Sequence, residues 1–301
     1  MPARSVAFLG LGAIGRPMAA RLAPAHAPDL TLRVWNRTSA KAEEFAREHG
    51  ARVAATPAEA ARAADVVITC FPVSADVESV LEGANGLLAG MTKGATLVDC
   101  TSGDPATSRR IAARLAERGI GYLDAPVSGG VKGAVEGNLT FMVGGDAALL
   151  GRVRPVLEHC GKKIVHCGPV GAGDALKAVN NALLAIHIWS AGEGLVALAK
   201  AGVKPDVALD VINASSGRSN TSMNLFPERV LTRAFPRTFR LALLDKDIGI
   251  AAEVARELKV PTPLIQLTAD LFRIAHNALG EEADHVETVK LLEQWAGQEI
   301  K

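Results

Sequence analysis

The first half of the chain alternates short apolar runs with stretches in which apolar residues recur at the helical period. Short apolar runs predict buried strands, and the helical spacing predicts amphipathic helices. A repeated strand and helix favours right-handed crossovers and a mostly parallel, doubly wound sheet covered on both faces. The predicted strand and helix pairs are 5–10 with 15–23, 30–36 with 40–50, 65–72 with 75–83, and 95–101 with 105–119; further strands are predicted at 121–127, 139–145 and 162–168.

The pattern changes after about residue 166, where long helical periods replace the strand signals. The turn "GPVGAGD" marks this joint, and an apolar helix starts directly after it. We therefore predict an α/β domain over residues 1–165 and an all-α domain over residues 166–301.

Composition and charge exclude several classes of protein. Hydrophobic residues make up 49% of the chain and charged residues 22%, which is typical of a globular protein and not of a disordered or fibrous one. The net charge is +1 with both signs interspersed, so there is no broad basic surface for nucleic acid or anionic lipid. We expect no nucleic-acid partner, and any bound anion must be held locally.

Cysteine usage and the start of the chain bear on location. Cys70, Cys100, Cys160 and Cys167 show no paired framework, and the first apolar stretch is too short for a signal peptide. These features favour a reducing, cytoplasmic setting. No apolar run approaches the roughly 20 residues needed to cross a bilayer, so we expect no membrane association.

A glycine loop follows the first predicted strand. Gly10, Gly12 and Gly15 in "FLGLGAIGRPM" have the G-x-G-x-x-G spacing between a strand and a helix. In a dinucleotide site the first glycine permits a tight turn, the second lets a pyrophosphate approach the backbone, and the third lets helix and strand pack closely. A simple tight turn is the alternative, but the strand and helix context favours a cofactor site that also includes Ala13 and Ile14.

The end of the second predicted strand bears on the choice of cofactor. An NAD-binding unit usually carries an acidic residue there for the ribose 2′-hydroxyl, whereas this chain has Asn36, Arg37 and Thr38. A guanidinium and a hydroxyl can hold a 2′-phosphate that a carboxylate would repel. We therefore expect NADP(H) as the preferred cofactor, with NAD(H) possible; a surface arginine that binds nothing is the alternative.

One lysine interrupts the apolar helix that follows the joint. Lys177 shares its helical face with Asn181, Leu184 and Ile188, which are uncharged. A lysine whose stem packs on the helix while its amine reaches water is the common arrangement. The alternative is a cation kept in a pocket, with an amide one helical turn away that can reach the same bound molecule.

A group of potential metal ligands lies near the joint but does not predict a metal site. His159, Cys160, His166 and Cys167 are close in sequence. Adjacent residues of a strand point to opposite faces, so each His-Cys pair cannot converge on one ion. We predict no metal.

Several motifs together resemble the β-hydroxyacid dehydrogenase family, which includes 3-hydroxyisobutyrate dehydrogenases and glyoxylate or succinic semialdehyde reductases. The resemblance extends over nearly the whole chain and implies a Rossmann domain that binds NADP, followed by a helical domain for substrate binding and oligomerisation. It rests on "GLGAIGRPM" (10–18), "VDCTSGDPATS" (98–108), "DAPVSGGVKGAVEGNLTFMVGG" (124–145), "GAGDALKAVNN" (171–181) and "LLDKDIGIA" (243–251).

The resemblance implies a role for each matching residue. The catalytic lysine of the family falls on Lys177 and its amide partner on Asn181. The substrate-binding serine-glycine-glycine falls on Ser128, Gly129 and Gly130, where a hydroxyl and unshielded N–H groups suit a small carboxylate substrate. The implied reaction is hydride transfer between the nicotinamide and a small β-hydroxy acid or its semialdehyde, with the lysine as general acid and base.

Other positions follow from the same resemblance. Lys246 is assigned to the cofactor, and Asp247 and Phe239 to the substrate. Ser102 stands where many relatives have threonine, and its hydroxyl could keep the contact near the nicotinamide. Ile14 replaces the usual methionine of the glycine loop, which conserves apolar volume. The remaining cofactor positions are Phe71 and Pro72.

The polar loop at 215–222 is a candidate for substrate specificity, because Arg218 could pair with a second carboxylate; a surface turn is the alternative.

Three other activities are compatible with a chain of this general pattern. An imine reductase generally has another residue at the lysine position, so Lys177 speaks against that reading. A 6-phosphogluconate dehydrogenase would need a longer helical half and basic contacts for a phosphate. A catalytically silent nucleotide-binding protein would lack the lysine, whereas Lys177, Asn181 and Ser128 are all present. The family resemblance further implies a homodimer or a homotetramer.

Overall fold

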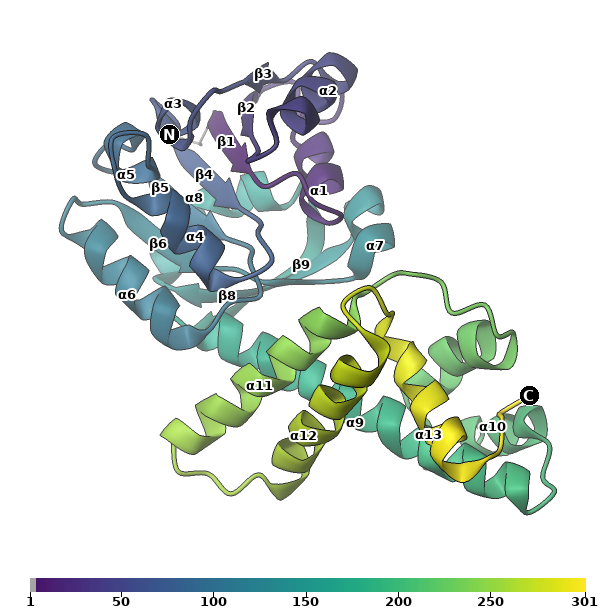
Figure 1. Cartoon of the computed structure of the whole chain (residues 1–301). Helices are drawn as coiled ribbons and strands as arrows, with labels where there is room; N and C mark the ends of the chain where they lie inside the picture. The colour runs from purple at the N-terminus through teal and green to yellow at the C-terminus, as the bar shows by residue number, and fades with distance from the viewer. Residues whose placement is uncertain (1–3) are drawn as a thin grey trace. The chain divides into compact units, whose positions relative to one another are not determined.

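The computed structural model describes residues 4–301, and the chain divides into two compact units, Met1–Lys177 and Ala178–Lys301. The division falls inside one long helix, somewhat later than the boundary expected at residues 165 and 166. Figure 1 shows the α/β architecture of the first unit and the helices of the second. The predicted order, a mostly parallel sheet with flanking helices followed by a helical region, is confirmed.

The first unit is built on one mixed sheet with the strand order β3-β2-β1-β4-β5-β6-β8-β7, and β9 pairs with β8. The pairs from β3 through β6 are parallel, whereas β6 and β7 pair antiparallel with β8. The strand order reverses at β1, so the carboxyl ends of β1 and β4 form the switch point at which such sheets bind ligands. The strands are β1 (Ser5–Leu9), β2 (Thr31–Trp35), β3 (Arg52–Val53), β4 (Val66–Thr69), β5 (Thr96–Asp99), β6 (Gly121–Asp124), β7 (Val127–Ser128), β8 (Leu139–Gly145) and β9 (Gly161–Gly168).

Helices cover both faces of this sheet. Buried residues of α1, α2, α7 and α8 share one core with the strands, and those of α3 to α6 share another. The helices are α1 (Gly15–Arg21), α2 (Ser39–His49), α3 (Pro57–Ala61), α4 (Ser74–Leu81), α5 (Leu87–Gly90), α6 (Pro105–Ala116), α7 (Gly130–Glu136) and α8 (Ala147–Leu157).

The two cores follow from the alternation of side chains along each strand. Phe8 and Ile68 belong to one core, and their neighbours Leu9 and Val67 belong to the other. Because successive side chains of a strand point to opposite faces, both sets are buried only when helices cover both faces. The nearly uninterrupted apolar runs of the sequence have this cause.

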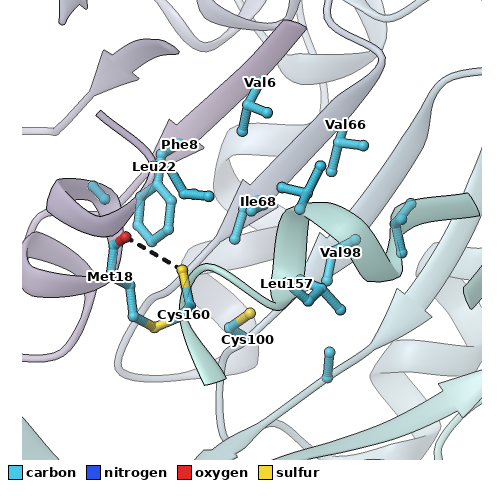
Figure 2. Close-up of a cluster of buried hydrophobic side chains, with 14 of the residues drawn as sticks. Val6, Phe8, Met18, Leu22, Val66, Ile68, Val98, Cys100, Leu157 and Cys160 are labelled. Atoms are coloured by element: carbon cyan, nitrogen blue, oxygen red, sulfur yellow. Dashed lines mark hydrogen bonds between the residues drawn. The ribbon is translucent and has the colours of Figure 1, made fainter. Parts of the chain in front are cut away.

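Figure 2 shows the first of these cores. Met18 of α1, Leu22 directly after it and Leu157 of α8 are fully buried against the strands. The Cys160 thiol donates a hydrogen bond to the Met18 carbonyl oxygen at 3.4 Å, so this cysteine has a packing role beside α1.

The second unit is helical and has its own core. The Trp189 ring lies 5.9 Å from the rings of both Phe272 and Trp295, and Phe226 is fully buried in the same cluster. Its helices are α9 (Ala172–Lys200), α10 (Pro205–Asn213), the π-helix η1 (Thr221–Leu231), α11 (Leu241–Glu257), α12 (Pro263–Leu279), the 3-10 helix η2 (His285–Glu287) and α13 (Thr288–Ala296), with α9 beginning in the first unit.

Helix α9 is long and apolar enough, by length and composition, to cross a membrane, and 39% of its most apolar window is buried in the structure. The expectation that no segment has these dimensions is therefore wrong, because it considered only uninterrupted apolar runs. Isolated polar residues such as Asn181 interrupt the run without ending the helix. The core helix of a soluble protein passes the same test, and Ala182, Ala185 and Ile188 of α9 are fully buried in the core of the second unit.

A buried carboxyl joins three strands of the sheet. Asp99, at the end of β5, accepts hydrogen bonds from the Thr69 hydroxyl at 2.8 Å and the Thr101 N–H at 3.1 Å, and the Tyr122 hydroxyl lies 3.4 Å away. Burial raises the pKa of Asp99 to about 6, and these hydrogen bonds offset part of that rise.

The glycine loop offers a test of the fold. A Cβ added at Gly15 would overlap the carbonyl oxygen of Gly10, whereas one added at Gly12 would meet no atom within 4 Å. Gly15→Ala should therefore lower the free energy of unfolding by about 1–3 kcal/mol, while Gly12→Ala should change it by less than about 0.5 kcal/mol. Urea denaturation measures both, and equal losses in the two variants would contradict the packing described for α1.

Asp99 offers a test by pH. Its folded-state pKa of about 6 lies above the ordinary value of 3.8, so the folded chain binds this proton more tightly than the unfolded chain. The resulting stabilisation is full below about pH 4 and is lost as the pH rises through about 6. The free energy of unfolding of the wild type relative to Asp99→Asn should fall by about 3 kcal/mol across this range. A difference that stays constant with pH would mean that folding does not raise the pKa of Asp99.

Candidate functional site

The glycine loop at the end of β1 has the geometry of a dinucleotide cradle. Gly10 has φ +100°, and a Cβ there would overlap the Cys70 carbonyl oxygen and lie 2.9 Å from the Phe71 ring. Gly12 is exposed with open space where its side chain would be, and Gly15 packs against Gly10. The three glycines thus have the three roles that their spacing predicts: a tight turn, an open approach and close helix packing.

Residues at the end of β2 lie beside this loop. The Asn36 side chain accepts a hydrogen bond from the Leu11 N–H at 2.9 Å and donates one to the Thr38 carbonyl oxygen at 3.1 Å. Asn36 therefore ties the glycine loop to the end of β2. The Arg37 side chain is 84% exposed, and its guanidinium lies 3.4 Å from the Asp76 carboxylate at the start of α4.

The ends of β4 and β5 complete this edge of the sheet. The Phe71 N–H donates to the Thr101 hydroxyl at 3.1 Å, so the segment after β4 is fixed to the segment after β5. Ser102 is half-buried next to Thr101, and Pro72 is exposed. Of the predicted cofactor residues, the structure brings the glycine loop, Asn36 and Phe71 to one edge.

The serine-glycine-glycine segment forms the join between β7 and α7. Ser128 is half-buried and pairs with Thr140 of β8. Gly129 has φ +134° and Gly130 has φ +63°, and a Cβ at Gly130 would meet no atom within 4 Å. A φ of +134° is rare for any residue but glycine, and a φ of +63° favours glycine. The open space at Gly130 leaves its backbone accessible to a small anion.

Lys177 lies in the second turn of α9 and is half-buried. The first turn is held by Asp124, the last residue of β6, whose carboxylate accepts hydrogen bonds from the N–H groups of Gly171 at 2.8 Å and Asp174 at 3.0 Å. The side chain of Asp174 in turn accepts a 2.6 Å hydrogen bond from the Ser108 hydroxyl. Sequence reasoning missed Asp124 and Asp174; the signal was an acidic residue in each of two otherwise apolar segments.

The two aspartates form a buried carboxyl pair. Burial, followed by the neighbouring Asp124 charge, raises the pKa of Asp174 well above its ordinary value. Burial also raises the pKa of Asp124, but the N–H groups of Gly171, Asp174 and Gly173 lower it. Those donors lie at the start of a helix and stabilise negative charge, so they oppose the rise of the pKa at Asp124.

A second group of predicted residues meets within the helical unit. Asn181 and Asp247 are both buried, and the Asn181 amide nitrogen donates to the Asp247 carboxylate at 2.6 Å. The Lys246 amine lies 3.0 Å from the other carboxylate oxygen. Asp247 thus fixes the orientation of the Asn181 amide, which lies one helical turn after Lys177 on α9.

Phe239 is half-buried just before α11 and is held by its backbone. Its N–H donates to Asp284 at 2.9 Å, and its carbonyl oxygen accepts from the His285 N–H at 2.9 Å. Burial alone would raise the pKa of Asp284, but His285 and the N–H groups of Phe239 and Thr238 hold it well below the ordinary value. Arg218 lies in the turn before η1 and is exposed.

The cysteines and histidines near β9 serve separate contacts. The His166 ring nitrogen lies 2.8 Å from the Gly145 carbonyl oxygen, and the neighbouring Cys167 thiol contacts the Val165 carbonyl oxygen. Within residues 4–301, no group of three or more His, Cys, Asp or Glu side chains is placed to hold a metal ion.

These observations fit a dinucleotide at the carboxyl edge of the sheet. The open approach above Gly12 leaves room for a pyrophosphate, and the Phe71 ring and the exposed Arg37 flank the glycine loop across the switch point. The residues present therefore suit a nicotinamide cofactor.

Two known protein families match the chain, one in each half. Residues 5–168 match the NAD binding domain of 6-phosphogluconate dehydrogenase. Residues 171–292 match the family described as the NAD-binding domain of NADP-dependent 3-hydroxyisobutyrate dehydrogenase.

Individual relatives are similar over nearly their whole length. The chain is 36% identical to 2-(hydroxymethyl)glutarate dehydrogenase of Eubacterium barkeri, over 98% of this chain and 97% of that protein. It is 35% identical to NAD-dependent L-serine dehydrogenase of Pseudomonas aeruginosa, over 98% and 100%. The structure of Mycobacterium tuberculosis 3-hydroxyisobutyrate dehydrogenase with L-serine matches with a TM-score of 0.87 and 33% identity, covering 97% of this chain and 99% of that one. The chain therefore belongs to the β-hydroxyacid dehydrogenase family of nicotinamide-dependent oxidoreductases.

Proposed function

We propose that this protein transfers a hydride between NADP(H) and a small β-hydroxy acid or its semialdehyde, with Lys177 as the general acid and base. The observation that carries the proposal is the position of Lys177 on α9, one turn after the capped end of the helix and one turn before the oriented amide of Asn181. A cation and an amide on one helical face can contact the same oxygen atom.

The proton transfer is assigned to Lys177. The bound nicotinamide supplies or accepts the hydride. In reduction, the Lys177 ammonium stabilises the charge that develops on the carbonyl oxygen and donates a proton to it. In oxidation, the neutral amine removes the hydroxyl proton. Asn181, oriented by Asp247, positions the reacting oxygen.

The substrate carboxylate is assigned to Ser128, Gly129 and Gly130. A hydroxyl with exposed N–H groups can bind an anion without a neighbouring cation, and the open space at Gly130 admits it. The compounds named with the three relatives, 2-(hydroxymethyl)glutarate, L-serine and 3-hydroxyisobutyrate, share a primary alcohol β to a carboxylate. We propose that this chain acts on the same unit, HOCH₂–CHR–COO⁻, with Arg218 as a candidate contact for a second carboxylate in R.

The preference for NADP(H) is assigned to Arg37 and Thr38. Both side chains are exposed at the end of β2, which carries no carboxylate to repel a 2′-phosphate. The guanidinium of Arg37 lies 3.4 Å from the Asp76 carboxylate at the surface. Such an exposed ion pair contributes little free energy, so Arg37 can leave it to bind a phosphate. Since one relative is named as NAD-dependent and the second matching family is described as NADP-dependent, both cofactors need testing.

The alternatives are distinguished by substrate. An imine reductase would consume NADPH with cyclic imines and not with semialdehydes, and a catalytically silent protein would bind NADPH without consuming it. The decisive assay follows nicotinamide absorbance with glyoxylate, succinic semialdehyde, methylmalonate semialdehyde and tartronate semialdehyde. NADPH oxidation by methylmalonate or tartronate semialdehyde, whose aldehyde group is β to the carboxylate, supports the proposal. Oxidation only by glyoxylate or succinic semialdehyde would overturn the β-hydroxy acid assignment, and oxidation by imines alone would overturn the whole proposal.

We also propose a self-associated, cytoplasmic protein. Exposed apolar side chains on α10 and α12, such as Val211, Leu264 and Leu267, suit a subunit interface, which supports a homodimer or homotetramer. The four unpaired cysteines suit a reducing cytoplasm. We expect no nucleic-acid or membrane partner.

The role of Lys177 predicts the effect of removing it. Lys177→Ala should lower kcat by about 10²–10⁴-fold and leave the dissociation constant of NADPH nearly unchanged, because only the proton transfer is lost. Lys200→Ala, an exposed lysine at the end of the same helix, is the control and should keep full activity. Stopped-flow absorbance and fluorescence titration provide the two measurements. Comparable kcat values in both variants would refute the assignment.

The role of Arg37 predicts a change in cofactor preference. Arg37→Ala should raise the KM for NADPH by roughly 10–100-fold, the value of a charge-assisted hydrogen bond, and should leave the KM for NADH almost unchanged. Arg47→Ala, an exposed arginine of the neighbouring α2, is the control. An equal effect on both cofactors would show that Arg37 does not bind the 2′-phosphate.

A further inference from the structure

The carboxyl group of Asp124 is buried in a position that its strand does not require. Asp124 ends β6 and is 1% exposed, and it points away from water toward the start of α9. A buried carboxylate is costly unless hydrogen bonds satisfy it. Its two oxygens accept from the N–H groups of Gly171 and Asp174, which lie at the start of α9.

These N–H groups would otherwise lack a partner. The first N–H groups of a helix have no intrahelical acceptor and are usually satisfied by the side chain of the residue before the helix. That residue is Gly171, which has no side chain. Asp124 therefore caps α9 from a strand that is 47 positions earlier in the sequence, as the separation from Gly171 shows.

Glycines on both sides make this contact possible. A Cβ at Gly173 would overlap the Met142 carbonyl oxygen and lie 2.8 Å from an Asp124 carboxylate oxygen. A Cβ at Gly144 of β8 would lie 2.5 and 2.6 Å from the two Asp124 oxygens. The first turn of α9 is thus clamped onto the backbone of β8 with the carboxylate between them.

The same segment that carries Asp124 also carries the predicted carboxylate site. Ser128 follows Asp124 in "DAPVS" and pairs with Thr140 of β8, while the Met142 N–H donates to the Pro126 carbonyl oxygen at 3.0 Å. Lys177 follows Asp174 within one turn of α9. A rigid helix transmits the position of its first turn to its second, at about 1.5 Å per residue.

We propose that Asp124 is a positioning residue for Lys177: by capping α9 from the end of β6, it sets the place of the Lys177 amine relative to Ser128, Gly129 and Gly130. This inference rests on the proposed function, because it takes Lys177 as the acid and base. A misplacement of about 1 Å at a reacting group can cost about 10²-fold in rate, so a capping bond outside the reacting atoms can control kcat.

The test uses Asp124→Asn and Asp124→Ser with NADPH and methylmalonate semialdehyde. Asparagine replaces one acceptor by an amide NH₂ group that faces the N–H donors. Serine keeps a single acceptor in a smaller side chain. Both variants should lower kcat at least tenfold, with the dissociation constant of NADPH within twofold of the wild type. The control is Asp146→Asn, which removes a side-chain cap of the same type, from the Leu149 N–H at 2.7 Å, at the start of α8. It should lower the melting temperature without lowering kcat.

A double-mutant cycle separates positioning from general loss of structure. If Asp124 acts through Lys177, then Asp124→Ser should not lower the residual kcat of Lys177→Ala any further. Additive losses, or a kcat within twofold of the wild type in both Asp124 variants, would overturn the inference while Lys177 kept its role. Full activity of Lys177→Ala alone would instead overturn the proposed function, whatever the Asp124 variants show.

Discussion

The hydrogen bonds from the N–H groups of Gly171 and Asp174 to the Asp124 carboxylate are the constraint on which the arrangement of the candidate site depends. They join the end of the sheet to the start of α9, the helix that continues from the first unit into the second. The carboxylate also stands at the positive end of the helix dipole, where an anion is stabilised. The buried Asp124 carboxyl group thus connects the strand that leads to Ser128 with the helix that carries Lys177.

The Asp124 carboxyl group also affects its neighbour, because its charge raises the pKa of Asp174 in addition to burial. Two buried carboxylates cannot both be ionised at low cost, and the capping donors all favour the charge on Asp124. Asp174 is joined through Ser108 and Tyr122 to Asp99 at the end of β5. With Thr69, these side chains form one hydrogen-bonded chain across β4, β5, β6, α6 and α9.

Much of this could be predicted from the sequence, and the remainder has definite physical reasons. The alternation of strands and helices predicted the sheet correctly, because strands that are buried on both faces appear in the sequence as apolar runs. In the first unit, the short β3, β7, α3, α5 and α7 and the longer α8 escaped prediction. At α7, Gly129 and Gly130 read as a turn although the helix begins at Gly130. Asp124 and Asp174 escaped it too, because a contact between residues so distant in sequence leaves no periodic signal. The contact of Asn36 with Leu11 was likewise hidden, although Asn36 itself was singled out.

Arg37, at the candidate cofactor site, and Asp124, beside the candidate catalytic lysine, differ in how freely they can change during evolution. Its side chain packs in no core and forms one weak surface contact, so a substitution there alters charge without disturbing folding. Asp124, enclosed between Gly144 and Gly173, has no such freedom, because a larger side chain would meet their backbone and a side chain without acceptors would leave the N–H groups of Gly171 and Asp174 unsatisfied. Single substitutions at Arg37 could therefore change the preferred dinucleotide during evolution. A change at Asp124 would require compensating changes at Gly144 and Gly173, so the residues around Lys177 are expected to evolve together.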